Sequence, residues 1–131
     1  MSITLSDKQV LTSLRSLVEE NREKVYKSPG DSALGICYYV HQDVEGKKSA
    51  GCIVGHLLNR LGIPLEDLEE AETNGAQAAM SIVGVTGVSY PVQTLLRNIQ
   101  RHQDTGKPWG EAFDLARKEN PYGDPYAESK A

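Results

Sequence analysis

The sequence has few cysteines and few large aromatic residues. Its 131 residues include two Cys, one Trp and one Phe, which excludes a disulfide-dense scaffold. No uninterrupted apolar run approaches the roughly 18 residues of a membrane-spanning helix, and the N-terminal residues lack the pattern of a secretory signal. We therefore expect a protein of the reducing cytoplasm with no membrane partner, in which both cysteines are thiols or metal ligands.

The chain also lacks any run of basic residues. Fourteen Lys plus Arg stand against 18 Asp plus Glu, which gives a net charge of −4. Binding to nucleic acid requires several cations on one face, so we do not expect a nucleic-acid partner. The charge is unevenly spread, because residues 49–90 carry one Arg and five acids, whereas residues 91–118 carry five bases and three acids.

Apolar residues at helical spacing predict most of the fold. Ser6 and Gln9 form a capping-box pattern at the start of the first stripe, and a Pro-Gly turn follows the last stripe residue, Val25. Further stripes end at Gly and Pro residues. The helices that these patterns predict cover residues 7–26, 51–61, 65–71, 91–103 and 108–119.

The remaining segments have weaker patterns. Residues 36–45 are rich in β-forming residues, and 48–52 could return as their partner strand. Residues 74–90 mix helix formers with Gly84 and Gly87, which is compatible with a short helix followed by a loop. We expect a mainly α (α+β) protein, with about five helices around one core and one short β-hairpin.

One globular domain is expected over residues 1–119, because this length suits a single compact domain. Residues 120–131 contain two prolines and a glycine and no apolar stripe, so we expect a flexible or surface-wrapped tail. The predicted core joins the last two helices to the first. Its main members are Leu14, Leu17, Leu95, Leu96, Ile99, Trp109 and Phe113.

Two Cys-x3-His pairs raise the possibility of a zinc site. Cys37 and His41 form the first pair and Cys52 and His56 the second, so four suitable ligands lie within twenty residues. The order matches no zinc-finger pattern. The simpler interpretation is that both cysteines are small core residues, that His41 starts a hairpin loop and that His56 lies at the edge of the core, with no cofactor. Their burial also predicts that Cys37 and Cys52 lie close together.

Cys52 also has an interpretation as a catalytic nucleophile. It follows Gly51 and would lie at a helix N-terminus, where the helix dipole lowers the pKa of a thiol. His56 or His41 would then act as the base of a Cys-dependent hydrolase. No third orienting group is identifiable, and the apolar neighbours favour a core position for Cys52. Gly51-x-x-x-Gly55 is more typical of close helix packing than of a phosphate-binding loop.

The predicted helix at 65–71 has a strongly acidic outer face. A solvated surface is the simplest interpretation, and recognition of a basic partner is the alternative. The residues of this face that we consider for partner binding are Glu66, Asp67, Glu69, Glu70 and Glu72.

Three stretches of the chain resemble other proteins. They are Cys37-Tyr-Tyr-Val-His, the segment 51–65 beginning Gly-Cys-Ile-Val-Gly-His, and the segment 103–113, Gln-Asp-Thr-Gly-Lys-Pro-Trp-Gly-Glu-Ala-Phe. Together these stretches resemble small uncharacterised proteins of actinobacteria and their bacteriophages. The resemblance implies a setting, a phage or prophage accessory protein inside a bacterial host, and no reaction.

A binding function is the class that the sequence favours. No complete catalytic motif is present, so enzymatic activity is not expected. The distinctive surface is instead an acidic helix beside a mildly basic helical hairpin, and such separation of charge can steer a protein partner or favour self-association. The alternatives are a zinc-stabilised module and a Cys52-dependent hydrolase.

Overall fold

The computed structural model describes residues 3–26, 39–42, 45–72 and 75–127. Its described residues form six helices and four very short strands. The helices are α1 (Asp7–Glu20), α2 (Ile53–Arg60), α3 (Leu65–Glu70), α4 (Ala76–Ile82), α5 (Tyr90–Asp104) and α6 (Trp109–Glu119). The strands are β1 (Ile3–Thr4), β2 (Val40–Gln42), β3 (Lys48–Ala50) and β4 (Val85–Thr86).

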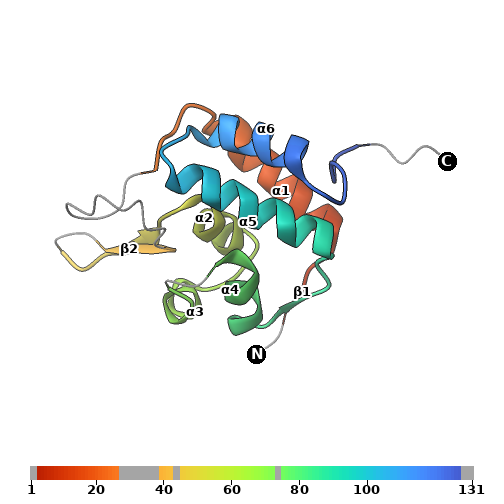
Figure 1. The fold of residues 1–131 in the computed structure, drawn as a ribbon. Helices are drawn as coiled ribbons and strands as arrows, with labels where there is room; N and C mark the ends of the chain where they lie inside the picture. The colour runs from red at the N-terminus through yellow and green to blue at the C-terminus, as the bar shows by residue number, and fades with distance from the viewer. Residues whose placement is uncertain (1–2, 27–38, 43–44, 73–74, 128–131) are drawn as a thin grey trace.

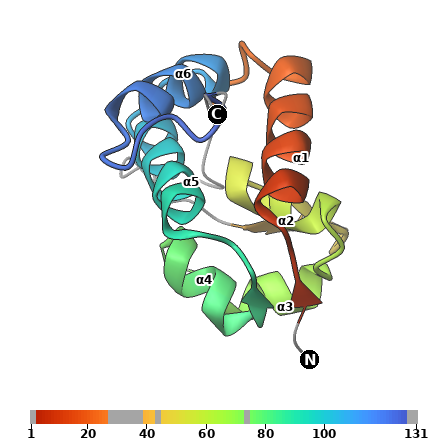
Figure 2. The same ribbon diagram turned by 90° about the vertical axis from the view of Figure 1, so that its right-hand side faces the viewer.

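The helices lie in two groups with α2 between them. Helices α1, α5 and α6 form the upper part of the molecule, and α3 and α4 lie below them (Figure 1, Figure 2). The predicted fold class is confirmed: the structure is mainly helical with a short antiparallel hairpin. The additional helix is α4, which occupies the first part of the segment predicted as a short helix and loop.

The predicted core is also confirmed. Trp109, Phe113 and the predicted leucine and isoleucine residues of α1 and α5 are each at most 1% exposed and belong to one hydrophobic cluster. Burying a large side chain of this kind contributes about 1.5–3 kcal/mol. In the described part of the chain, we find no helix long and apolar enough to span a bilayer.

Helix α1 begins as predicted and ends earlier. The Ser6 hydroxyl accepts a hydrogen bond from the N–H of Gln9, and the Gln9 side chain accepts one from the N–H of Ser6, so the capping box is confirmed. The helix ends at Glu20 rather than at residue 26, because the Asn21 side chain donates to the Leu17 carbonyl at 2.9 Å and caps the last turn.

The chain after α1 lies against the start of α6. The N–H groups of Trp109 and Gly110 donate to the carbonyls of Lys24 and Arg22, both at 2.9 Å. A Cβ atom on Gly110 would lie 3.0 Å from the Arg22 carbonyl oxygen, so this approach requires glycine. The segment 22–26 is thereby held beside the N-terminus of α6.

Strands β2 and β3 form the predicted hairpin in a shorter form. His41 pairs with Ser49 and Val40 with Ala50, and residues 36–38 lie outside the described residues. Helix α2 packs closely on this hairpin at Gly55, where a Cβ atom would lie 2.8 Å from the Tyr39 Cα. The interpretation of Gly55 as a packing glycine is therefore confirmed.

A second pairing, between β1 and β4, was not predicted. The two strands run parallel, with Ile3 opposite Val85 and Thr4 opposite Thr86. Each strand has two residues, which is too short for a periodic signal. Gly87 has a φ of +92°, and a Cβ atom there would lie 2.5 Å from the Leu5 carbonyl oxygen, so this junction depends on glycine.

The described part of the C-terminal tail lies on the helices. The Asn120 side chain donates to the Pro91 carbonyl at 2.9 Å, and Arg117 pairs with Asp124. The Tyr126 hydroxyl donates to the Leu11 carbonyl at 2.7 Å. Residues 120–127 therefore follow the surface from α6 to α1.

Candidate functional site

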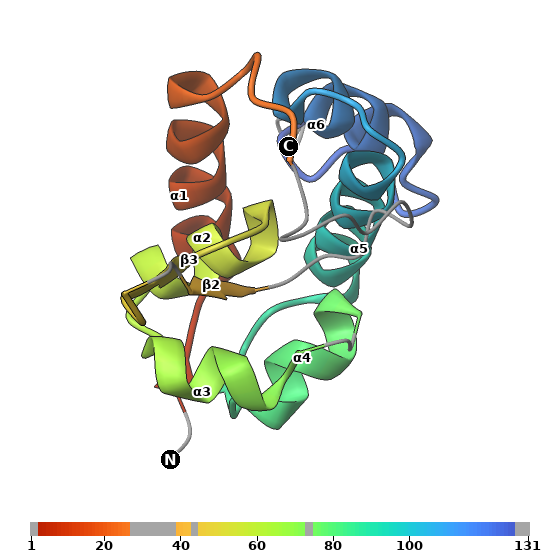
Figure 3. The ribbon, with the colours of Figure 1, turned by 90° about the vertical axis from the view of Figure 1, so that its left-hand side faces the viewer.

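Of the two histidines in the Cys-x3-His pairs, His41 lies on strand β2 and His56 on helix α2, which packs on the β2–β3 hairpin. Figure 3 shows this hairpin lying across the end of α2. His41 is part of β2, and its Nε2 lies 2.8 Å from the Tyr26 hydroxyl. Burial lowers the pKa of His41, and the nearby charge of Lys24 lowers it further. His41 is therefore a neutral imidazole at pH 7 with a phenol as its partner.

His56, in the middle of α2, is enclosed by aromatic and cationic groups. Its ring packs edge-on against Trp109, with 5.5 Å between the ring centroids, and the Lys24 ammonium lies 4.7 Å from the Trp109 ring centroid. Burial is the main reason why the pKa of His56 falls to about 4, and the charges of Lys24, Arg60 and His41 add to it. At pH 7 His56 is also neutral.

Trp109 carries the one buried side-chain polar atom that lacks a hydrogen-bond partner among the described residues, its indole Nε1. The residue is fully buried and contacts both the Lys24 ammonium and the His56 ring. The sequence predicted Trp109 only as a core residue. Its position beside His56 had no local signal, because the two residues are 53 positions apart and come into contact only in the folded chain.

Cys52 differs from its predicted state. It is fully buried at the N-cap of α2, and it is disulfide-bonded. The expectation of a thiol is therefore wrong for Cys52. The sequence contains one other cysteine, Cys37, which lies outside the described residues, as does the predicted proximity of the two.

The disulfide bears on the two Cys-based alternatives, which both require a free thiol at Cys52. A disulfide sulfur is neither a thiolate nucleophile nor a thiolate ligand, and a base with a pKa near 4 is poorly matched to proton abstraction at pH 7. Within the described ranges, no three His, Cys, Asp or Glu side chains are placed to hold a metal ion. Of the proposed zinc ligands Cys37, His41, Cys52 and His56, the first lies outside these ranges.

A second polar cluster, which sequence patterns did not reveal, lies beside the start of α2. The side-chain carbonyl oxygen of Gln103 accepts a hydrogen bond from the Ile53 N–H at 2.8 Å, and the side-chain NH2 of Gln103 donates one to the Asp104 carboxylate at 2.9 Å. Burial raises the pKa of Asp104 to about 6. Gln100 donates to the hydroxyl of the fully buried Tyr39 at 3.2 Å. These groups supply hydrogen bonds to buried polar atoms at the centre of the fold.

The acidic residues of the 65–72 segment fall into two groups. Glu69 pairs with Lys48 at 2.6 Å, and Glu72 accepts a hydrogen bond from the Tyr39 N–H at 2.6 Å. Burial raises the pKa of Glu72, against the opposing effect of its backbone hydrogen bonds. These two carboxylates attach α3 to the β2–β3 hairpin.

The other three carboxylates point to solvent. Glu66, Asp67 and Glu70 are exposed, and none makes an ion pair with another described residue. Glu66 and Glu70 are four residues apart, which places them on the same face of α3. We name these three residues the acidic surface.

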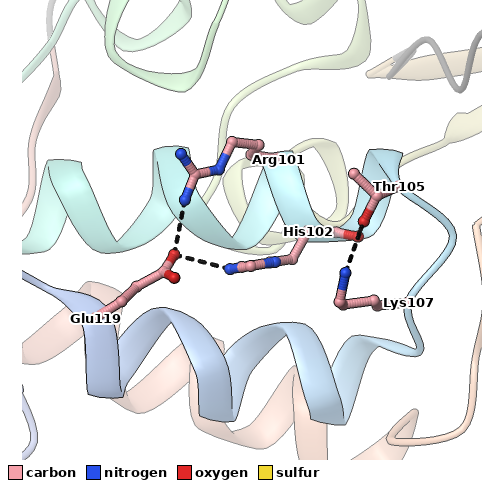
Figure 4. A network of polar contacts seen from close by, with 5 residues as sticks. All are labelled: Arg101, His102, Thr105, Lys107 and Glu119. Carbon is pink, nitrogen blue, oxygen red and sulfur yellow. Dashed lines mark hydrogen bonds and ion pairs between the residues drawn. The ribbon is translucent and has the colours of Figure 1, made fainter.

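The basic helical hairpin of α5 and α6 is partly neutralised. Figure 4 shows Arg101 and His102 both reaching Glu119, at 2.9 and 2.8 Å. Lys107 donates to the Thr105 hydroxyl at 3.1 Å. Part of the positive charge on this hairpin is therefore offset where Glu119 of α6 faces Arg101 and His102 of α5.

Comparisons with known proteins give no information on the function. No protein-family model matches the chain, and neither the curated proteins nor the solved structures contain a match. The resemblance to actinobacterial and phage proteins accordingly stays a prediction.

Proposed function

We propose that the chain acts by binding another protein, and that the acidic surface on α3 recognises a basic segment of this partner. The observation that supports this proposal is that the five acidic residues of one short segment have two different roles. Glu69 and Glu72 fix α3 to the hairpin, while Glu66, Asp67 and Glu70 stay exposed without ion pairs among the described residues. The surface is thereby held in place without losing its charge.

The electrostatics of the surface suit encounter with a partner. Exposed charges of one sign act mainly on association rate and on specificity, because solvent screens their contribution to stability. Self-association is a second form of the same function, because Arg97 and Lys118 of the α5–α6 hairpin are exposed cations on another copy of the chain. The resemblance of three sequence stretches to phage and actinobacterial proteins supports a phage or prophage accessory role in a bacterial host.

The disulfide at Cys52 bears on that setting. Disulfides persist mainly in oxidising compartments, so the disulfide at Cys52 does not support the expectation of a reducing cytoplasm. The bacterial setting rests on the resemblance alone. The proposed binding function does not depend on the redox state of Cys52, because α3 is attached through Glu69 and Glu72.

The test uses charge reversal with a matched control. The probe is a ten-residue peptide of Lys and Arg, titrated by calorimetry at several salt concentrations. The variant Glu66→Lys/Glu70→Lys changes the net charge from −4 to 0, and so does the control Glu23→Lys/Glu111→Lys, whose two residues are exposed elsewhere. We expect the first variant to lose roughly ten-fold in affinity at low salt and to show a flatter salt dependence.

The control should bind nearly as the parent chain does. Equal losses in both double variants would mean that net charge alone governs binding, and unchanged binding in the first variant would return α3 to a solvated face. Sedimentation velocity of the same variants without peptide reports self-association. A Cys52→Ser variant that folds but no longer binds would contradict the proposal as well.

A further inference from the structure

A groove lies between α1 and the C-terminal tail, on a surface remote in sequence from α3. Its volume is about 560 Å³, which falls in the range of small-molecule sites, about 300–1,000 Å³. The chain after α6 turns back toward α1 to form one wall of it (Figure 1). The residues that line the groove are Lys8, Leu11, Thr12, Arg15, Ser16, Pro125 and Tyr126.

The lining carries two cations and, among the described residues, no carboxylate. Lys8 and Arg15 make no ion pair in the described part of the chain. The acids nearest to them along the chain and in the tail are already engaged: Asp7 accepts from the Ser89 N–H at 2.8 Å, Asp124 pairs with Arg117 and Glu19 with Arg22. The charge of Arg15 also contributes to lowering the pKa of Asp124, but Lys8, Arg15 and Arg117 outnumber this one carboxylate, so the groove keeps a net positive charge that suits an anionic ligand.

The Arg15 guanidinium is held in position by stacking. It lies 4.5 Å from the centroid of the Tyr126 ring, and Arg117 lies 4.9 Å from the same centroid. The ring is fixed by its hydroxyl bond to the Leu11 carbonyl and by an edge contact with Phe113. A guanidinium that lies over an aromatic ring still has the N–H donors of its own plane available. Their planar, forked arrangement matches phosphate oxygens.

The polar groups follow one face of α1. Lys8, Thr12 and Ser16 are successive i, i+4 neighbours, and Arg15 lies seven residues after Lys8, a rise of about 10.5 Å. Both cationic side chains are long enough to reach the hydroxyl of Thr12 between them. The apolar part of the lining comes from Leu11, Pro125 and Tyr126. Because two guanidinium groups lie over the Tyr126 ring, Leu11 and Pro125 are the apolar surface left for a ligand.

We propose that this groove binds a small phosphorylated molecule, with its phosphate groups between Lys8 and Arg15 and its apolar body against Leu11 and Pro125. A nucleoside diphosphate has this combination of charge and aromatic body. The ligand site is separate from the acidic surface on α3, so it goes beyond the proposed protein binding, and either can fail without the other.

Calorimetric titration of the full chain tests the site with three probes: ADP, pyrophosphate and adenosine. We expect ADP to bind, pyrophosphate to bind more weakly and adenosine not to bind. Lys8→Gln should weaken ADP binding about ten-fold, because one charge-assisted hydrogen bond is lost. Since Lys8 is exposed without an ion pair among the described residues, this variant leaves the fold intact.

A matched control and a conservative variant complete the test. Arg97→Gln removes one exposed cation outside the groove and should bind ADP as the parent chain does. Arg15→Lys keeps the charge and loses the planar fork, so its affinity should fall less than that of Arg15→Gln. No ADP binding at millimolar concentration, equal losses in Lys8→Gln and Arg97→Gln, or adenosine binding as tight as ADP would each overturn the proposal.

Discussion

At His56 the cost of burying a charge decides the protonation state. Burial lowers its pKa to about 4, with smaller contributions from the charges of Lys24 and Arg60 and from His41 when that ring is protonated. Burial raises the pKa of Asp104 to about 6. Both shifts favour the neutral form. They act on stability in opposite directions of pH, because the folded state resists protonation at His56 and promotes it at Asp104.

The shift at His56 predicts acid sensitivity. As pH falls from 6.5 toward 4, the unfolded chain binds a proton at this histidine and the folded chain does not, so stability is lost in that window. Between pH 7 and 5 we expect the parent chain to lose about 1–2 kcal/mol more than His56→Gln. Urea unfolding followed by the fluorescence of Trp109, the sole tryptophan, measures both losses.

The comparison uses only the change with pH, since Gln lacks the ring that packs on Trp109 and the two proteins differ at pH 7. His41 and Asp104 titrate in both proteins and largely cancel. Parallel pH profiles for the two would show that His56 is not protected from protonation in the folded state, contrary to its burial.

Individual residues were the part of the site that sequence could predict least. The spacing of Cys52 and His56 predicted neighbours on one helix face. In the structure Cys52 is the N-cap of α2 and His56 lies within the helix, with its N–H bonded to the Cys52 carbonyl. Nothing local indicated that Lys24 and Trp109 would enclose His56, because these contacts come from the docking of 22–26 on α6. The thiol expectation for Cys52 failed for a different reason, since it rested on the expected reducing compartment rather than on the geometry around Cys52.

At the scale of the elements, local signals set most boundaries. The capping box fixed the start of α1, and Gly and Pro residues ended α2 and α5 within about two residues of the predicted positions. The shorter end of α1 depends on one side chain, Asn21, which caps the last turn. The β1–β4 pair joins segments about 80 residues apart, so no sequence window contains both strands.

The packing of α2 on the hairpin gives a test at this scale. Gly55→Ala places a Cβ atom against the backbone of Tyr39. Backbone atoms cannot move aside as the end of a side chain can, so helix α2 must shift away from the hairpin. We expect a loss of about 1–3 kcal/mol in the free energy of unfolding, measured by urea denaturation. Gly75→Ala is the control, because a Cβ atom there meets open space.

The control should lose less than about 1 kcal/mol, which reflects only the poorer N-cap. A Gly55→Ala protein as stable as the parent would mean that α2 does not approach the hairpin as closely as the structure shows. It would then also remove the packing reason for glycine in the Gly-x-x-x-Gly pattern.

At the scale of the whole molecule, the charges are separated in space. The acidic surface belongs to α3, at the lower end of the fold, and the cationic groove belongs to α1, in the upper helical group (Figure 2). The sequence predicted the acidic segment and a charge imbalance between regions. It could not divide the five acids into two anchors and three exposed carboxylates, because the partners of Glu69 and Glu72 come from the hairpin.

The most direct test of the proposed protein binding is an NMR titration of the isotope-labelled chain with the Lys/Arg peptide, because it reports the position of binding on each backbone amide. We expect the largest changes in amide chemical shift on residues 65–72 and on the adjoining strand β3, with small changes along α1. Shift changes centred on α1, α5 or α6, or spread evenly over the chain, would contradict the assignment of the acidic surface as the binding site.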